Sequence, residues 1–228
     1  MGFCLLNNVA LAAAHALQHG KERVAIVDWD VHHGNGTQDA FYRDPRVLFV
    51  SLHQAPFYPG SGTAAEVGDA DGKGFNVNLP LSAGASDAVY AAAFERIVLP
   101  VLDQYAPDLV LVSAGFDAHA RDPLAGMMLT ADGFGVMARG VRAIAEQHAG
   151  GRLGLLLEGG YDLEGLETSL LATLEAAARN PAPDRGGAAP LDAAGSGPRA
   201  GRRGAPPLLE ALTAGPLANG LAAALTSE

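Results

Sequence analysis

Short apolar runs alternate with longer amphipathic segments along most of this chain. Four of the runs are rich in Val, Ile and Leu and are too short to be helices, so they predict buried parallel strands. These strands are expected over residues 24–30, 47–53, 109–117 and 153–161. A fifth run, 75–81, alternates apolar with polar residues and contains Pro80, which favours a shorter strand nearer an edge of the sheet.

The segments between these runs have the spacing of amphipathic helices. Helices are expected over residues 8–19, 86–105 and 131–149. The first has Asn7 or Asn8 as its N-cap and Gly20 just past its end. Alternating strands and helices predict an α/β protein whose mainly parallel sheet is covered on both faces, and in such sheets active sites gather at the carboxyl ends of the strands.

Polar side chains that are costly to bury stand at the carboxyl ends of four of the predicted strands. They are Asp30 with His32, Ser51 with His53, Asp117 with His119, and Glu158 to Tyr161. On a single strand, such residues most often form an acidic end that is hydrogen-bonded to nearby backbone amides. The same pattern on four strands favours a shared site instead.

The stretch VAIVDWDVHHGNGTQ, residues 24–38, places Asp28, Asp30 and His32 on one side of a strand, because side chains alternate between the two faces. The glycine-rich part that follows is expected to be a turn. Asp30 and His32 can lean onto one ion, and Asp117 would supply a second carboxylate. Two carboxylates and one imidazole, with other positions open to water and substrate, are compatible with a catalytic zinc site.

Composition narrows the class of protein. With 49% hydrophobic and 18% charged residues in a chain of 228, the sequence is that of an ordinary globular protein. The single cysteine, Cys4, excludes an internal disulfide framework, and no leader or membrane-spanning run is apparent, so a cytoplasmic protein is expected. The net charge of −10 disfavours nucleic acid as a direct partner and would attract a cationic substrate.

The last fifth of the chain has a different composition. Residues 180–228 are rich in Pro, Gly and Ala and lack periodicity, which predicts a disordered tail after a domain over 1–179.

Five motifs, in order, resemble the zinc-dependent histone deacetylase family, in the wider group that includes acetylpolyamine amidohydrolases and acetoin-utilisation proteins. They are GFCLLNN (2–8), VDWDVHHGNGTQ (27–38), VSLHQAPFYPGSG (50–62), SAGFDAHARDPLAG (113–126) and LLEGGYDLEGL (156–166). The pattern is most similar to the class II-like and bacterial members. The resemblance implies an arginase/deacetylase-like three-layer α/β/α fold and hydrolysis of the acetyl amide of an acetylated lysine, polyamine or small-molecule amine.

The resemblance also implies roles for particular residues. Asp30, His32 and Asp117 fall on the family's zinc ligands, in agreement with the argument from the strand ends. Tyr161 falls on the phenol that donates a hydrogen bond to the developing oxyanion, which is the catalytic role expected of it here.

Further positions match the family's substrate tunnel and its structural ion site. Phe3 and Tyr58 match the aromatic tunnel walls, and Gly159 matches a glycine that lets the substrate pass. Asp28 and Ser51 match a site for a structural monovalent cation such as K⁺. For Asp28, a simple hydrogen-bonding role is an equally good interpretation.

One expected element is not found in the sequence. Relatives carry, before GFCLLNN, a GHH segment whose paired histidines act as general base and acid, whereas this chain begins at Met1 next to that motif. We therefore expect a deacetylase domain that is incomplete at its N-terminus, lacks its first strands and is impaired in turnover. We also expect strand 24–30 to be an unprotected edge, which would favour aggregation.

Several alternatives stay open at this point. One is that the start of the chain has been assigned too late. Another is that the chain is a non-catalytic paralogue or fragment that binds metal and acyl-lysine. A third alternative is an arginase-type ureohydrolase, which holds two metal ions. The extra ligands of such a site are not apparent in the sequence. Asp122 lies too far along the chain to be assigned as a bridging ligand.

Overall fold

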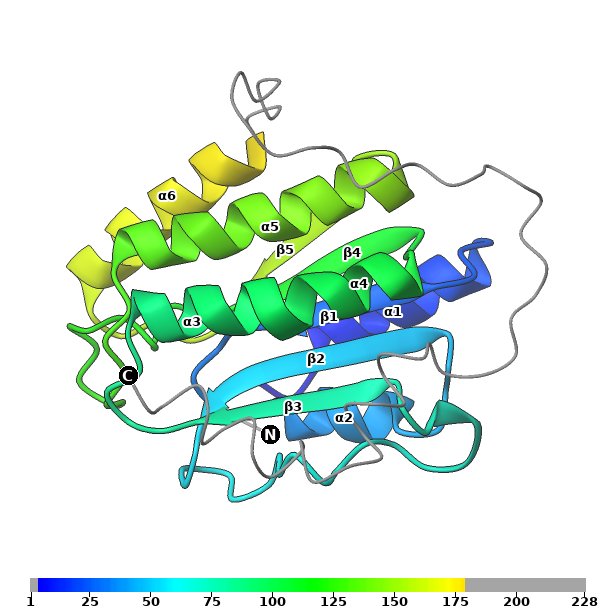
Figure 1. Ribbon diagram of the computed structural model, residues 1–228, viewed down its shortest axis with the longest axis horizontal. Coiled ribbons are helices and arrows are strands. Elements are labelled where there is room, and N and C mark those ends of the chain that lie inside the picture. The colour runs from blue at the N-terminus through cyan, green and yellow to red at the C-terminus, as the bar shows by residue number, and fades with distance from the viewer. Residues whose placement is uncertain (1–3, 179–228) are drawn as a thin grey trace.

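A five-stranded parallel sheet forms the middle layer of residues 4–178, the part of the chain that the computed structural model describes (Figure 1). Its strands are β1 (Val24–Asp28), β2 (Val47–Gln54), β3 (Asn76–Leu81), β4 (Leu109–Ala114) and β5 (Leu153–Leu157). The strand order is β3-β2-β1-β4-β5, so β1 lies in the centre.

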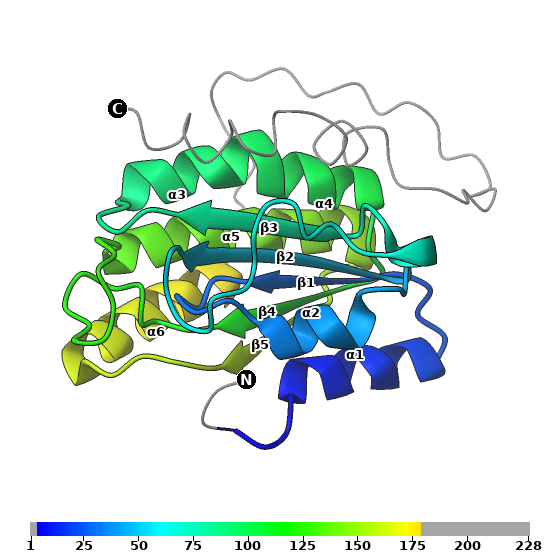
Figure 2. The same cartoon turned by 90° about the horizontal axis from the view of Figure 1, so that it is seen from below.

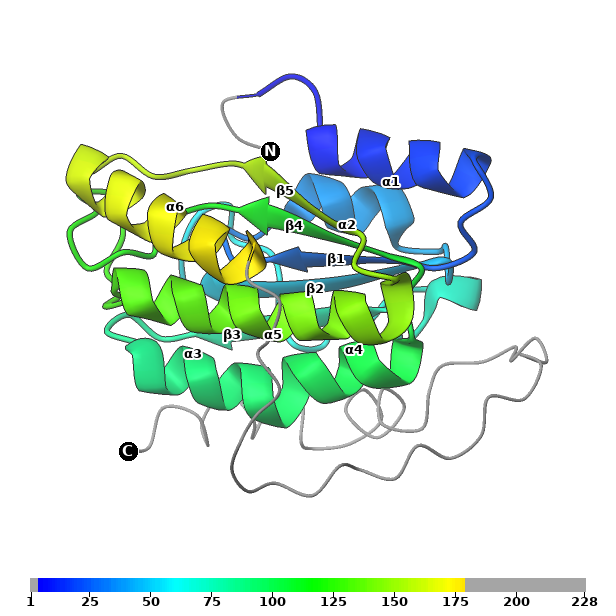
Figure 3. The ribbon, with the colours of Figure 1, turned by 90° about the horizontal axis from the view of Figure 1, so that it is seen from above.

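Helices cover both faces of this sheet and complete a three-layer α/β/α arrangement. One face carries α3 (Asp87–Ala93), α4 (Leu99–Tyr105), α5 (Ala131–Ala149) and α6 (Leu163–Ala178), and a π-helical turn, η2 (Phe94–Val98), joins α3 to α4. The opposite face carries α1 (Asn8–Gln18) and α2 (Asn35–Phe41), as Figures 2 and 3 show. A short 3₁₀ helix, η1 (Ala70–Gly72), precedes β3.

The central strand β1 shows why the sequence folds in this way. All five of its residues are buried, and their apolar side chains alternate between two separate clusters. Val24 and Ile26 pack into the cluster beneath α1, whereas Ala25 and Val27 pack into the larger cluster beneath α3, α4 and α5. The apolar run therefore encodes a strand that is covered on both faces.

The predicted elements agree closely with the observed ones. All five strands and the three helical segments are confirmed, with strand ends that are one to four residues shorter in several places. Asn7 caps α1 by accepting a hydrogen bond from the backbone N–H of Ala10. The alternating run that contains Pro80 is the edge strand β3, as expected.

Two parts of the prediction need correction. Strand β1 is not an edge, because it is hydrogen-bonded to β2 on one side and to β4 on the other. The exposed edge on the β4 side is β5, where Leu157 keeps 60% of its surface exposed. The segment that begins at Asn35 is helix α2, although its glycines predicted a turn.

Some predictions fall outside the described residues. The tail over 180–228 is one of these, and Phe3 is another. Among residues 4–178, no helix has both the length and the apolar character needed to cross a membrane.

Candidate metal centre and its surroundings

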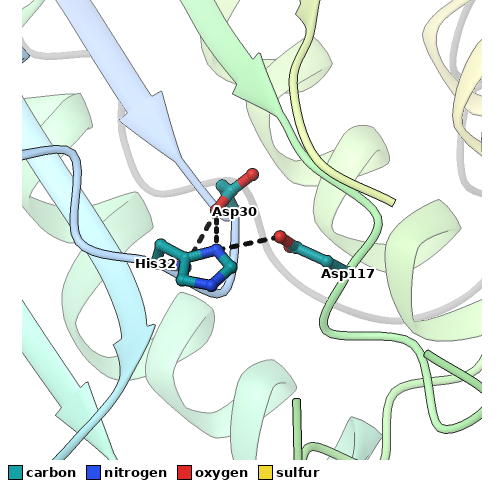
Figure 4. A group of neighbouring side chains, drawn as sticks. All are labelled: Asp30, His32 and Asp117. Atoms are coloured by element: carbon teal, nitrogen blue, oxygen red, sulfur yellow. Dashed lines mark hydrogen bonds and ion pairs between the residues drawn. The ribbon is translucent and has the colours of Figure 1, made fainter. Parts of the chain in front are cut away.

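Three side chains with metal-binding atoms converge at the carboxyl ends of the neighbouring strands β1 and β4 (Figure 4). Asp30 and His32 lie in the loop that follows β1, and Asp117 lies in the loop that follows β4. One ligand atom from each lies within 4.8 Å of the others. The three residues named from the strand ends therefore lie together, and their role as metal ligands stays a prediction.

Backbone amides hold both carboxylates in place. The N–H of Val31 donates to Oδ1 of Asp117 at 2.8 Å, and the N–H of Gly159 donates to Oδ2 of Asp30 at 2.9 Å. The N–H of His32 also donates to Oδ1 of Asp30 at 2.8 Å. Because these donors belong to two different loops, one after β1 and one after β5, the geometry of the cluster is fixed by the fold.

The imidazole of His32 lies between the two carboxylates. Its Nδ1 is 3.0 Å from Oδ2 of Asp117 and 3.1 Å from Oδ1 of Asp30. Hydrogen bonds to Asp117 and then to Asp30 raise the pKa of His32 to about 10. Burial raises the pKa of Asp117 to about 6, because its carboxylate has no exposed surface. The two carboxylates therefore favour a positive charge at this position.

The backbone around the carboxylates leaves room for nothing larger than glycine. A Cβ atom on Gly159 would overlap the carboxylates of Asp117 and Asp30, and a Cβ on Gly115 would overlap Asp30. Both positions require close approach of the backbone rather than an unusual φ angle. The two glycines let the backbone approach both carboxylates closely, and the three residues fit a divalent cation with mixed nitrogen and oxygen ligands.

The close packing at Gly159 gives a first prediction. We expect Gly159→Ala to weaken binding of a divalent cation at this cluster by about 10-fold to 100-fold, because the added methyl group must displace two carboxylates that the fold holds in place. Competition with a chromophoric chelator measures the affinity. Gly135→Ala, in helix α5, is the matched control, since its Cβ would meet only ordinary contacts of 3.5 Å or more. Equal affinities for the two variants would contradict the claim that close packing of the backbone at Gly159 holds the two carboxylates in place.

Tyr161 lies close enough to this cluster for the charges of the two carboxylates to change the pKa of its phenol. Burial raises the pKa of the Tyr161 phenol, and the charges of Asp117 and Asp30 raise it further. The residue Tyr161 keeps 40% of its surface exposed, so it lies at the boundary between the cluster and solvent. A raised pKa keeps the hydroxyl protonated and able to donate a hydrogen bond.

Asp122 anchors the backbone of Tyr161, which the sequence did not reveal. Its carboxylate is buried and accepts hydrogen bonds from the N–H of Tyr161 at 2.8 Å and from the N–H of Leu124 at 2.9 Å. In the sequence, Asp122 stands out only as a residue that lies too far along the chain to bridge two metal ions. An aspartate before a proline in a loop carries no signal for such a contact, because the partner lies 39 residues away along the chain.

Aromatic rings cover one side of His32. The ring of Phe57 stacks on the imidazole with 5.2 Å between centroids and 24° between planes. Tyr58 meets the imidazole edge-on at 6.2 Å and is 56% exposed. The resemblance places Tyr58 at a tunnel wall and assigns no role to Phe57, its neighbour in the same motif (50–62).

Asp28 and Ser51 lie next to each other on β1 and β2, just before the loop that carries Asp30 and His32. They are register partners in the β1–β2 pair, and both are buried. Burial raises the pKa of Asp28 well above its usual range, with further contributions from Asp30 and Glu158. Oδ1 of Asp28 also accepts the N–H of Asp30 at 3.1 Å, so the hydrogen-bonding role holds, and a monovalent cation here stays a prediction.

Comparisons with known proteins agree with this arrangement. A model of the histone deacetylase domain matches residues 1–177. Histone deacetylase 10, chloroplastic, of Oryza sativa subsp. japonica is 48% identical over 183 residues, which cover 80% of this chain and 41% of that protein. The histone deacetylase-like amidohydrolase of Pseudomonas aeruginosa is 48% identical over 192 residues, which cover 81% of this chain and 50% of that protein.

Solved structures show the same likeness. The structure titled HDA15 HD domain superposes with a TM-score of 0.74 and 44% identity, covering 78% of this chain and 50% of that one. The structure of the histone deacetylase Clr3 gives a TM-score of 0.72 at 44% identity, covering 78% and 31%. The chain thus spans about half or less of the length of these relatives.

Proposed function

The chain belongs to the histone deacetylase domain family, and on this premise we propose that it is a zinc-dependent amidohydrolase that removes acetyl groups from acetylated lysine or polyamine-type amines. The observation that carries the proposal is the convergence of Asp30, His32 and Asp117, whose ligand atoms lie within 4.8 Å of one another. A donor set of two carboxylates and one imidazole leaves coordination positions free for substrate and water.

The residues around the cluster have complementary tasks in this proposal. Asp30, His32 and Asp117 would hold zinc, which would supply Lewis-acid chemistry toward an acetyl carbonyl and water. Tyr161 keeps its proton and donates a hydrogen bond to the oxygen on which negative charge develops. Phe57 and Tyr58 flank His32 and would hold the apolar stem of an acetylated amine beside it while excluding water.

Metal titration together with an activity assay tests the proposal. Protein freed of metal with a chelator is titrated with zinc, and hydrolysis of a peptide with one acetyl-lysine is followed at each step. We expect one zinc per chain and turnover that rises in proportion to the bound zinc. Two metal ions per chain with release of ornithine from arginine would instead indicate an arginase-type ureohydrolase.

A second candidate function is a non-catalytic protein that binds metal and acyl-lysine. The GHH segment with the paired histidines of the general base is not found within residues 1–228, so a protein made of these residues alone would bind acyl-lysine without rapid hydrolysis. Loss of a general base typically lowers a rate by about 10² to 10⁴. One equivalent of zinc and saturable binding of the acetyl-lysine peptide, without any hydrolysis, would support this second candidate over the first.

A further inference from the structure

The loop between β2 and β3 carries the two aromatic rings that flank His32. Residues 55–66 of this loop contain no strand or helix, so their position depends on contacts to the rest of the fold. The loop starts from a fixed point, because the N–H of Ala55 donates to the carbonyl of Leu81 at 2.8 Å. Phe57 also packs against the larger core cluster, whereas Tyr58 is mostly exposed. Tyr58 therefore depends on how the far end of the loop is held.

Glu66 binds the far end of the loop, at Gly62 and Thr63, through hydrogen bonds to its carboxylate. Its Oε1 accepts hydrogen bonds from the N–H of Gly62 at 3.0 Å, and from the N–H and hydroxyl of Thr63 at 2.8 and 3.0 Å. Its Oε2 accepts from Nε2 of Gln38 at 2.6 Å. Burial works to raise the pKa of Glu66, but these hydrogen bonds outweigh it and hold that pKa below its usual range. A charged acceptor with four donors is a strong attachment.

Gln38 ties Glu66 to the sheet and to the segment that carries His32. Gln38 is buried in α2, the helix that begins just after the His32–His33 segment. Its Oε1 accepts from Nδ2 of Asn76 at 2.9 Å and from Nδ2 of Asn78 at 2.8 Å, both on β3. The same Oε1 lies 3.1 Å from Nε2 of His33, the residue next to His32. The carboxamide thus links three separate elements.

Two buried histidines complete the attachment of the loop. The side chains of His33 and His53 are both buried against the sheet end of the loop. Nε2–H of His53 donates to the carbonyl of Gly62 at 2.9 Å, and Nδ1 of His33 lies 2.8 Å from the hydroxyl oxygen of Ser61. Gly62 has a φ of +90°, and a Cβ there would press into both imidazole rings, so the loop lies directly against them.

We propose that Glu66 and Gln38 are positioning residues that hold the 55–66 loop against the sheet, so that Tyr58 stays beside His32 and the affinity for an acetylated amine is set. This inference deepens the proposed function and rests on it for the identity of the ligand. Neither residue is among the three metal-binding candidates, and both act through Tyr58. They therefore affect substrate affinity and leave metal affinity unchanged.

Glu66→Gln is the most specific test, because it preserves size and removes charge. The new amide can accept from Gln38 or from the Gly62 and Thr63 amides, but not from both sides at once. We expect the backbone amides of residues 61–63 to exchange hydrogen at least about tenfold faster. The matched control is Glu95→Gln, a change at an exposed glutamate in η2 with no expected effect on this loop. Unchanged exchange in Glu66→Gln would overturn the proposal.

A double-mutant cycle shows whether Glu66 acts through Tyr58. Anisotropy of a fluorescein-labelled acetyl-lysine peptide on the zinc-loaded full chain gives the affinity. We expect Glu66→Gln to raise Kd about tenfold with zinc affinity unchanged, and to add little in a Tyr58→Ala background. Additive effects of the two changes, or a loss of zinc affinity in Glu66→Gln, would overturn the proposal. If wild-type protein did not bind the peptide, the proposed function would fail, and hydrogen exchange would still decide the role of Glu66.

Discussion

Asp117→Asn is expected to lower the affinity for zinc by more than 100-fold while the domain stays folded. Asp117 has no exposed surface, and one of its oxygens lies 3.0 Å from Nδ1 of His32. Removal of hydrogen-bonding partners outside a metal's own ligands already costs about 10-fold to 100-fold, so removal of a ligand charge costs more. Asn keeps the shape and can still accept the N–H of Val31, which protects the fold. Chelator competition measures the affinity, and thermal melting checks the fold.

A surface carboxylate provides the comparison for this change. Asp39→Asn removes the same charge from an exposed position on α2, so it should leave both the melting temperature and the zinc affinity close to those of the wild type. Asp117→Ala should abolish zinc binding as well, but it leaves the N–H of Val31 without its acceptor and so confounds binding with stability. If Asp117→Asn kept full zinc affinity, Asp117 would not be a ligand and the proposed metal centre would be wrong.

The sequence predicted the sheet and the convergence at its end because both follow from local pattern. The residues of β1 alternate between two apolar clusters, and this period of two can be read without knowing any neighbour of the strand. Polar residues after β1 and β4 had to meet because carboxyl ends of parallel strands share one edge of the sheet. The three candidate ligands could therefore be named before their distances were known.

What the sequence did not predict depends on contacts between distant segments. The position of β1 at the centre of the sheet follows from pairing with both β2 and β4, and nothing in its own residues distinguishes that from an edge. Helix α2 forms in a glycine-rich stretch where Thr37 and Gln38 are buried, and Gln38 bonds to β3. Local propensity favoured a turn, and tertiary packing overrode it.

The contact between Asp122 and Tyr161 also joins distant segments, and it bears on the catalytic role that we propose for Tyr161. The buried carboxylate of Asp122 fixes the backbone from which the phenol projects, and it does so across 39 positions of sequence. A donor that stabilises developing charge must be held in place before the reaction, because reorientation during the reaction would cost part of its effect. The structure thus provides support for Tyr161 that the sequence alone did not indicate.

Tyr161→Phe is expected to lower turnover of an acetyl-lysine peptide by about 10² to 10³ while zinc affinity stays unchanged. The substitution removes one preformed hydrogen-bond donor, and losses of this size are typical when such a donor is deleted. It leaves the carboxylates and imidazole untouched, because Tyr161 is not among the residues whose ligand atoms converge. A steady-state assay should show the loss mainly in kcat, since the donor acts on charge that develops only in the transition state. Tyr42→Phe, which removes a phenol beside Arg43 at the C-terminal end of α2, is the control and should change neither quantity. Equal turnover in Tyr161→Phe and wild type would remove the phenol from the mechanism, because nothing else in the proposal would compensate for its loss.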